Sequence, residues 1–280
     1  MKSISVLIFL LLSSLCSVAQ DKQLYILQTS DTHSRIEPLD ERFGNSADKG
    51  GYVRRAAFVH EARKQHPELL LFDCGDISQG TPYYNMFKGE VEIKLMNLMK
   101  YDAMVLGNHE FDYGMDNMVR LFTLANFPIV CANYDVTGTV LDGLVKPYVV
   151  LVRNGIRIGV FGLSPRLEGL VQSDKCVGVV YHDPLEVAQR IVNLLRTQEA
   201  CDVVICLSHL GFNTETPDGH YDENLVNKTH GIDLILGGHT HTEMVKPAKH
   251  LNAVGKSVSV MHVGKNGVDV GELTLTLTEK

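Results

Sequence analysis

The segment 107–112 combines three side chains that are suited to chemistry. Asn108 offers an amide oxygen, which is a hard metal ligand, and His109 offers an imidazole. Asp112 follows three residues later and can hold that imidazole, as carboxylates do for catalytic and metal-ligating histidines. A strand-like apolar run, 103–106, leads directly into this segment. The pattern therefore predicts a tight loop that carries catalytic or metal-binding groups at the end of a strand.

Four further apolar runs end in the same kind of side chain. Asp31 and His33 follow the run at 24–27, and Asp76 follows the run at 69–72. His209 follows the run at 202–207, and His239 and His241 follow the run at 233–236. In open α/β sheets, ligands bind outside the carboxyl ends of the strands, so these groups converge if the strands are neighbours. Within each of the two pairs the residues are two apart, so an extended chain would point both side chains at one site.

For any one of these positions, a cap or turn residue is the simpler interpretation. The metal interpretation depends on the number, because all five strand ends carry suitable donors. The mixture of carboxylate, amide and imidazole favours Zn²⁺, Mn²⁺, Fe or Co²⁺ over Ca²⁺ or Mg²⁺ alone, and over a thiolate site.

The elements that must position these groups alternate between strand and helix. Helical spacing is present at 52–65, 91–99, 114–125 and 184–196. Two Asn-Gly pairs, 154–155 and 266–267, predict hairpins of the flanking strands. Alternation with inserted hairpins indicates a mixed sheet, or two packed sheets with helices outside, in one domain.

The amino terminus has the pattern of a secretory signal peptide. Lys2 precedes an apolar run at 4–12, and Ser17-Val18-Ala19 forms a small-residue cleavage site. The run is too short for a transmembrane helix. Cys16 raises the alternative of a lipid anchor, which the bulky Leu15 disfavours. We therefore expect residues 1–19 to be removed, and residues 20–280 to form an exported, periplasmic or extracellular protein without a membrane span.

Composition narrows the function further. The chain of 280 residues has a formal net charge of −7 and no basic stripe, which excludes nucleic acid as an expected partner. Of the 6 cysteines, all but Cys16 lie beyond the predicted signal peptide. The strand-like surroundings of most of them favour small apolar core residues over a disulfide framework. The pairing is left open for Cys74, Cys131, Cys176, Cys201 and Cys206.

The motifs together resemble those of the calcineurin-like metallophosphoesterases. They are Asp31-x-His33, Gly75-Asp76, Gly107-Asn108-His109-Glu110, His209 and Gly237-Gly238-His239-Thr240-His241. The longer stretches 24–33 and 101–112 resemble the two signatures of the 5′-nucleotidase family. The second stretch matches throughout, whereas the first departs at Gln28. His241 also stands where many 5′-nucleotidases have Gln or Asn, a difference that bears on metal preference.

This resemblance implies a fold and a cofactor. The fold would be a four-layer α/β/β/α metallophosphoesterase sandwich with mixed sheets, and the cofactor would be two divalent metal ions. One ion would be held by Asp31, His33, Asp76 and His241, and the other by Asp76, Asn108, His209 and His239. Asp76 would bridge the two ions, because a carboxylate has two oxygens.

The resemblance also implies the catalytic roles. Asn108 and His109 would contact the substrate phosphate, with His109 as an imidazolium that Asp112 orients. The activity would be hydrolysis of phosphate monoesters, with 5′-nucleotides as the first candidates. Cyclic nucleotides, sugar phosphates and other diesters remain as alternatives. A non-catalytic metal- or phosphate-binding envelope protein is a third interpretation, but such a protein has no need of a leaving-group acid.

Nucleotide selectivity is less well supported than phosphoester chemistry. The 5′-nucleotidases carry a C-terminal domain that holds the nucleoside between aromatic rings, and this sequence ends at Lys280, where that domain would begin. We therefore expect that selectivity needs a separate chain resembling that domain. Four aromatic residues neighbour the motif loops and are expected to serve core or rim packing rather than base stacking: Phe111, Tyr83, Tyr84 and Phe212.

Overall fold

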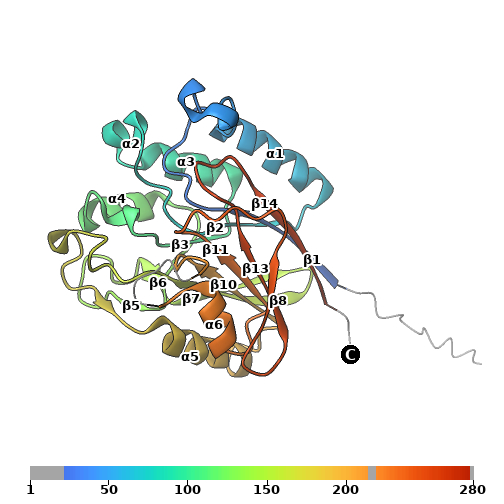
Figure 1. The fold of residues 1–280 in the computed structure, drawn as a ribbon. Helices are drawn as coiled ribbons and strands as arrows, with labels where there is room; N and C mark the ends of the chain where they lie inside the picture. The colour runs from blue at the N-terminus through green and yellow to red at the C-terminus, as the bar shows by residue number, and fades with distance from the viewer. Residues whose placement is uncertain (1–21, 214–218, 278–280) are drawn as a thin grey trace, which may run out of the picture.

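The computed structural model describes residues 22–213 and 219–277, so the predicted signal peptide and Cys16 lie outside the described residues. Two six-stranded mixed sheets pack face to face, and helices cover the outer face of each (Figure 1). This is the four-layer α/β/β/α sandwich that the sequence predicts. Among the described residues, every helix is too short or too polar to span a membrane.

The first sheet holds the strands that precede the segment 107–112. Its spatial order is β14 (Gly271–Leu277), β1 (Lys22–Thr29), β2 (Leu70–Asp73), β3 (Ala103–Val105), β4 (Ile129–Val130) and β6 (Val145–Lys146). Only β14 is antiparallel to its neighbour, and the other five strands run parallel. The carboxyl ends of β1, β2 and β3 therefore lie at one edge of the sheet.

The second sheet has antiparallel strands at both edges. Its order is β12 (Ala248–Leu251), β13 (Ser257–His262), β11 (Leu234–Gly237), β10 (Val203–Ser208), β8 (Ile156–Leu163) and β7 (Tyr148–Arg153). The four inner strands run parallel. A separate short ribbon pairs β5 (Tyr134–Asp135) with β9 (Val180–Tyr181).

One predicted hairpin forms and the other does not. Strands β7 and β8 pair antiparallel across Asn154 and Gly155, whose positive φ angles of 51° and 71° fit a type I′ turn. Asn266 and Gly267 also have positive φ, but β13 and β14 lie in different sheets. The prediction of a final antiparallel pair was wrong, because β14 extends the first sheet beside β1 and the Asn-Gly segment crosses between sheets.

The helices form the two outer layers. The first sheet is covered by α1 (Tyr52–Gln65), α2 (Pro82–Phe87), α3 (Glu90–Met99) and α4 (Met115–Leu124), and the second by α5 (Pro184–Thr197) and α6 (Asp222–Lys228) (Figure 1). Short 3₁₀ turns occur at η1 (Glu41–Ser46), η2 (His109–Phe111) and η3 (Ser173–Lys175). The four predicted helices are present, with ends within one residue of the prediction.

Three apolar layers hold the four structural layers together. On β2, Leu71 faces the helices while Leu70 and Phe72 face the other sheet, and each is fully buried. A strand that is covered on both faces reads as a continuous apolar run, which is why the period-2 alternation is absent here. All five cysteines among the described residues are free, and four of them are buried, which confirms their interpretation as core residues.

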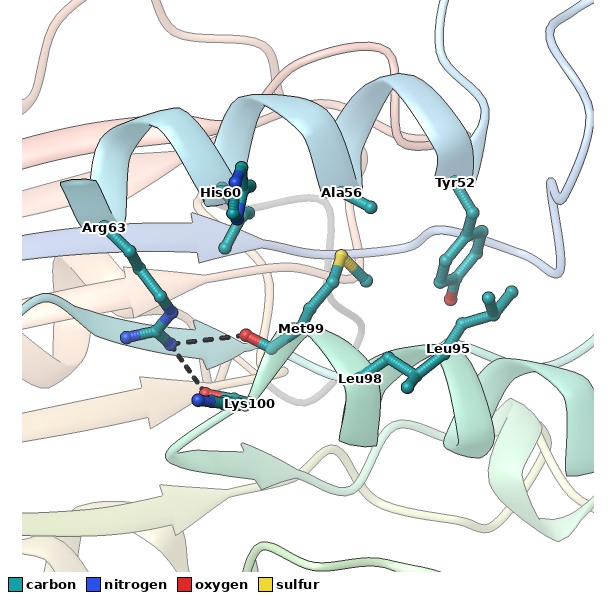
Figure 2. A pocket seen from close by; sticks show the side chains of 9 residues that line it. Tyr52, Ala56, His60, Arg63, Leu95, Leu98, Met99 and Lys100 are labelled. Carbon is teal, nitrogen blue, oxygen red and sulfur yellow. Dashed lines mark hydrogen bonds between the residues drawn. The ribbon is translucent and has the colours of Figure 1, made fainter.

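Helices α1 and α3 enclose an apolar groove of about 250 Å³ on the outer layer (Figure 2). At one end, the Arg63 guanidinium donates hydrogen bonds to the carbonyls of Met99 and Lys100, at 3.3 and 2.7 Å. These bonds satisfy acceptors at the C-terminal end of α3, where helix carbonyls lack partners. None of the predicted site residues lines this groove.

The two sheets pack closely at Gly162 on β8. A Cβ there would lie 2.3 Å from the carbonyl oxygen of Val130 on β4. Because backbone cannot move aside as a side-chain tip can, we expect Gly162→Ala to lower the free energy of unfolding by about 1–3 kcal/mol. Urea denaturation measures this. Gly159→Ala is the control, since its Cβ would meet only side-chain atoms of Leu195 and Cys201. An equal or smaller loss at Gly162 would contradict the packing argument.

Candidate metal centre

Strand ends from both sheets meet at one place and bring six of the seven predicted ligands together. Two compact groups result, in each of which one possible ligand atom per residue lies within 4.8 Å of the others. The first group is Asp31, His33 and His241, and the second is Asp76, His209 and His239. These groups match the two ligand sets that the family resemblance implies, apart from the shared Asp76 and the amide of Asn108.

The backbone of the ligand loops is held in an unusual conformation. Positive φ angles between 45° and 78° occur at Asp31, His33, Asp76, His239 and His241. Left-handed conformations are uncommon for residues other than glycine and persist where the surroundings fix them. The argument from an extended chain was therefore wrong in its geometry. Asp31 and His33 do share one group, but through left-handed turns, and His239 and His241 fall in different groups.

Backbone hydrogen bonds fix these loops against one another. The amides of Asp31 and His33 donate to the carbonyls of Gly75 and Asp76, at 2.9 and 3.1 Å. The amide of Asn266 donates to the Asp31 carbonyl at 2.7 Å. The Asn-Gly segment that fails to form a hairpin thus supports the loop after β1 instead.

Two glycines allow the loops to come this close. A Cβ at Gly107 would lie 2.1 Å from Asp76 Oδ1, and a Cβ at Gly238 would lie 2.2 Å from Ser30 Oγ. Any side chain at these positions would push a ligand loop away. The glycines of the Gly-Asn-His and Gly-Gly-His motifs are therefore required by space.

Asp76 belongs to the second group. Its Oδ1 accepts a hydrogen bond from the backbone amide of His109 at 2.9 Å, and its Oδ2 lies 3.0 Å from His209 Nε2. Burial raises the pKa of this carboxyl, but the neighbouring His209 outweighs burial and the net shift is downward. Burial also lowers the pKa of His209, yet Asp76 and Asp31 together raise it to about 10. Asp76 is thus held as a carboxylate beside His209, and its charge also acts on Asp31 and His33 of the first group.

Three of the histidines are kept neutral. Burial is the largest cause in each case, and it lowers the pKa of His33 and brings the pKa of His239 and of His241 to about 4. Neutral imidazole is the form that binds a metal. The Nε2 atoms of His33 and His241 face each other at 3.0 Å, and the Nε2 atom of His241 is also 3.5 Å from Asp31 Oδ1. A cation would satisfy both nitrogens and the carboxylate.

The donor set fits two divalent ions. Asn108 is 5% exposed, and its Oδ1 is buried without a hydrogen-bond partner. A buried amide oxygen without a partner is costly, and a metal ion would remove that cost. Together with the two groups of carboxylates and neutral imidazoles, this oxygen completes the kind of site that Zn²⁺, Mn²⁺, Fe or Co²⁺ prefers.

His109 and Asp112 form a pair at the rim of the centre. The turn η2 places both on one face, and His109 Nδ1 lies 3.2 and 3.1 Å from the two Asp112 carboxylate oxygens. Burial lowers the pKa of His109, but the hydrogen bond with Asp112 and the charge of Asp76 outweigh it, so the net shift is upward. With Nδ1 held by Asp112, the Nε2 atom is left to meet a substrate.

Glu110 is a supporting residue that the sequence reasoning quoted only as part of a motif. It is 1% exposed, and its carboxylate accepts hydrogen bonds from the amides of Gly107, Asp76 and Ile77 at 2.6, 3.1 and 3.0 Å. It therefore ties the loop after β3 to the loop after β2. An acidic residue next to the predicted catalytic histidine was the available signal.

A buried network supports the histidines of the second sheet. Asp222 on α6 accepts a hydrogen bond from Ser208 Oγ at 2.5 Å and faces His262 Nε2 at 2.7 Å. Gln28, where the sequence departs from the family signature, donates to the carbonyls of Gly237 and Met261 at 2.9 and 3.2 Å. Its amide thus links β1 to β11 and β13 across the sheets. No sequence pattern pointed to either contact.

The four aromatic residues near the motif loops mostly serve packing, as expected. Phe111 and Tyr84 are 0% and 2% exposed, so neither presents a ring face for stacking. Phe212 packs edge-on against His262. Tyr83 is more open, and its hydroxyl donates to Glu37 at 2.9 Å.

Comparisons with known proteins agree with this geometry. The family model for calcineurin-like phosphoesterase matches residues 24–243. A snake venom 5′-nucleotidase from Crotalus adamanteus is 35% identical over 237 residues, which cover 82% of this chain and 39% of that protein. The chain thus spans well under half the length of that relative, and about half of others such as the 5′-nucleotidase of Bos taurus, at 32% identity and 48% coverage.

Solved structures show the same relationship. The 5′-nucleotidase precursor from Thermus thermophilus superposes with a TM-score of 0.83 at 32% identity, over 92% of this chain and 52% of that one. The calcineurin-like phosphoesterase YfkN from Bacillus subtilis gives a TM-score of 0.76 at 28% identity, over 93% of this chain and 87% of that one. The chain belongs to the calcineurin-like metallophosphoesterases, and its relatives in that family include 5′-nucleotidases.

Proposed function

We propose that this chain is a metal-dependent phosphomonoesterase of the 5′-nucleotidase type. The observation that carries the proposal is the His109–Asp112 pair at the rim of two adjoining groups of metal-type ligands. A site that only binds phosphate or metal needs no proton donor beside it, so this pair favours catalysis over the alternative of a binding protein. Cyclic nucleotides, sugar phosphates and other diesters remain alternative substrates within the same chemistry.

The ligands would divide between two ions. Asp31, His33, Asp76 and His241 would hold one, and Asp76, Asn108, His209 and His239 the other. When bound, two divalent ions supply Lewis acidity that activates water and neutralises charge on a phosphoryl group.

The protein's own residues supply orientation and a proton. The amide of Asn108 and the imidazole of His109 would contact the phosphoryl oxygens. The imidazolium of His109 presents Nε2–H to the leaving oxygen, while Asp112 keeps the ring in place through Nδ1. A positioned acid of this kind contributes rate because it protonates the leaving group in the transition state.

Support for the location comes from the sequence. The predicted signal peptide at residues 1–19 supports export, with the activity in the periplasm or outside the cell. We also propose that tight nucleotide use draws on residues outside this catalytic unit, in a region that resembles the remainder of the longer 5′-nucleotidases.

Asp76→Asn tests the bridging role. The substitution should lower both metal content and turnover, because one carboxylate would bind both ions. Metal analysis of the purified protein measures this. Asp73→Asn is the matched control, since Asp73 is 1% exposed at the end of the same strand but belongs to neither group. Two bound ions with normal turnover in Asp76→Asn would exclude the bridging role.

His109→Asn separates chemistry from metal binding. It should retain both ions yet lose about 10²–10⁴-fold in kcat, the usual scale for an acid–base group. Asp112→Asn should lose less, because Asp112 orients and charges the ring without touching the substrate. The exposed Asp116→Asn serves as a control on the same segment. If His109→Asn lost its metal, His109 would be a ligand and not the acid.

Substrate selectivity tests the need for residues beyond this chain. We expect the chain alone to prefer AMP over ribose 5-phosphate only weakly in kcat/KM, because its aromatic rings near the centre are buried or engaged. A base–aromatic stack is worth about 1–3 kcal/mol, or roughly 5- to 150-fold. Steady-state kinetics with AMP, ribose 5-phosphate and p-nitrophenyl phosphate measure the ratio. A preference within or above that range would show that the chain carries its own base site.

A further inference from the structure

A cavity of about 470 Å³ lies beside the His109–Asp112 pair. It is bounded by the loop after β2, by α2, by η2 and by the segment that precedes β9. The lining residues include Asp112 itself, so the cavity begins one side chain away from the proposed acid. Nothing in the metal chemistry described above uses this space.

A second part of the cavity lining also adjoins the centre. Gln79 lines it and follows Asp76 by three residues. The next residue, Gly80, packs against His33, since a Cβ there would lie 3.3 Å from the His33 carbonyl oxygen. The φ angle of Gln79 is 78°, so the loop is held in an uncommon conformation at this point. The cavity is therefore flanked on two sides by residues that also hold the catalytic centre.

Four polar side chains of the cavity are not engaged with the protein. Within residues 22–213 and 219–277, the side chains of Gln79, Asn85, Gln172 and Lys175 make no hydrogen bond or ion pair. Beneath them lie apolar groups, among which Phe111 and Tyr84 are buried. The accessible lining is thus more polar than apolar, and the volume falls in the range of small-molecule sites.

The polar groups indicate the kind of ligand. An amide side chain both donates and accepts hydrogen bonds, as a hydroxyl group does, whereas Lys175 only donates. The charge of Asp112 is already compensated by His109. Stacking of an aromatic ring is disfavoured, because Phe111 and Tyr84 are buried and the Lys88 ammonium lies 5.1 Å from the ring centre of Tyr113.

We propose that this cavity is the leaving-group subsite of the enzyme and that it takes a neutral, hydroxyl-bearing alcohol of the sugar class. The proposal rests on the proposed function, because the leaving oxygen is placed at His109. A substrate whose phosphate lies on the ligand groups would extend its alcohol past His109 into the cavity. There the hydroxyls would meet Gln79, Asn85, Gln172 and Lys175.

Three substitutions test the subsite without touching the centre: Asn85→Ala, Gln172→Ala and Lys175→Met. All three side chains are exposed or half-buried, so the fold should be retained. For ribose 5-phosphate we expect kcat/KM to fall about 3- to 10-fold for each amide and about 10- to 50-fold for Lys175. For p-nitrophenyl phosphate, which brings no hydroxyl groups, it should stay within about twofold. Gln198→Ala, at the end of α5, and Lys249→Met, on β12, are the matched controls.

Binding provides a readout that does not depend on turnover. Ribose 5-phosphate added to ¹⁵N-labelled protein should shift the side-chain amide signals of Asn85 and Gln172, and inorganic phosphate should not. Equal losses for both substrates in the variants, or no loss for either, would overturn the subsite. So would unshifted amide signals. Absence of p-nitrophenyl phosphate hydrolysis by the metal-loaded wild type would instead refute the proposed function, and the amide signals would still decide the subsite.

Discussion

The carboxylate of Asp76 is the charge on which the centre depends. It is 2% exposed and lies at the crossing of loops from both sheets, where it contacts the His109 amide and the His209 imidazole. Removing a carboxylate from water costs several kcal/mol unless partners replace the water. Those partners come from β3 and β10, so the charge is compensated only when the two sheets are packed in register. The geometry of the centre therefore depends on the packing of the two sheets.

The carboxylates around Asp76 add to the buried negative charge that must be compensated. Burial raises the pKa of Asp31 and of Asp73 to about 7, and it raises the pKa of Glu110 as well. So many buried acids cannot all carry charge without cations among them. Backbone amides provide part of the compensation at Glu110, and His209 provides part at Asp31 and Asp76. Divalent ions in the two ligand groups would supply further compensation, and the uncompensated charge would favour their binding.

Much of this could be predicted from the sequence because the signals are local. A strand that ends in Asp, Asn or His places that side chain at a known edge of a parallel sheet, and five such endings specified the site. The signals for the helices at 52–65 and 184–196 were also local, because the spacing of apolar residues within each segment indicated which face of the helix is buried. The prediction that the cysteines are core residues was also local, because a small apolar residue in a buried strand needs no disulfide partner.

The sequence was uninformative where a residue serves a distant neighbour. Asn266 and Gly267 have the backbone of a hairpin turn, yet the strand that follows pairs with β1, at the opposite end of the described chain. Which strand β14 pairs with depends on which sheet edge is unpaired, and no local sequence pattern indicates this. Gln28 links two sheets, and Asp222 joins a helix to two strands, so each is recognisable only once the layers are stacked.

The cavity beside the His109–Asp112 pair, our proposed leaving-group subsite, is likewise formed by residues distant in the sequence. The four polar residues that make no contact with the protein come from a loop, a short helix and a segment much later in the chain, and none of these four stands in a motif. The charged residues at the strand ends are buried, so each needs particular partners, and such residues stand in recognisable motifs. Side chains that face solvent around the cavity carry no such constraint, because replacing them costs the fold little. In the proposed enzyme, substrate choice can therefore change on this surface while the metal ligands stay fixed, so the motifs indicate the family but not the alcohol.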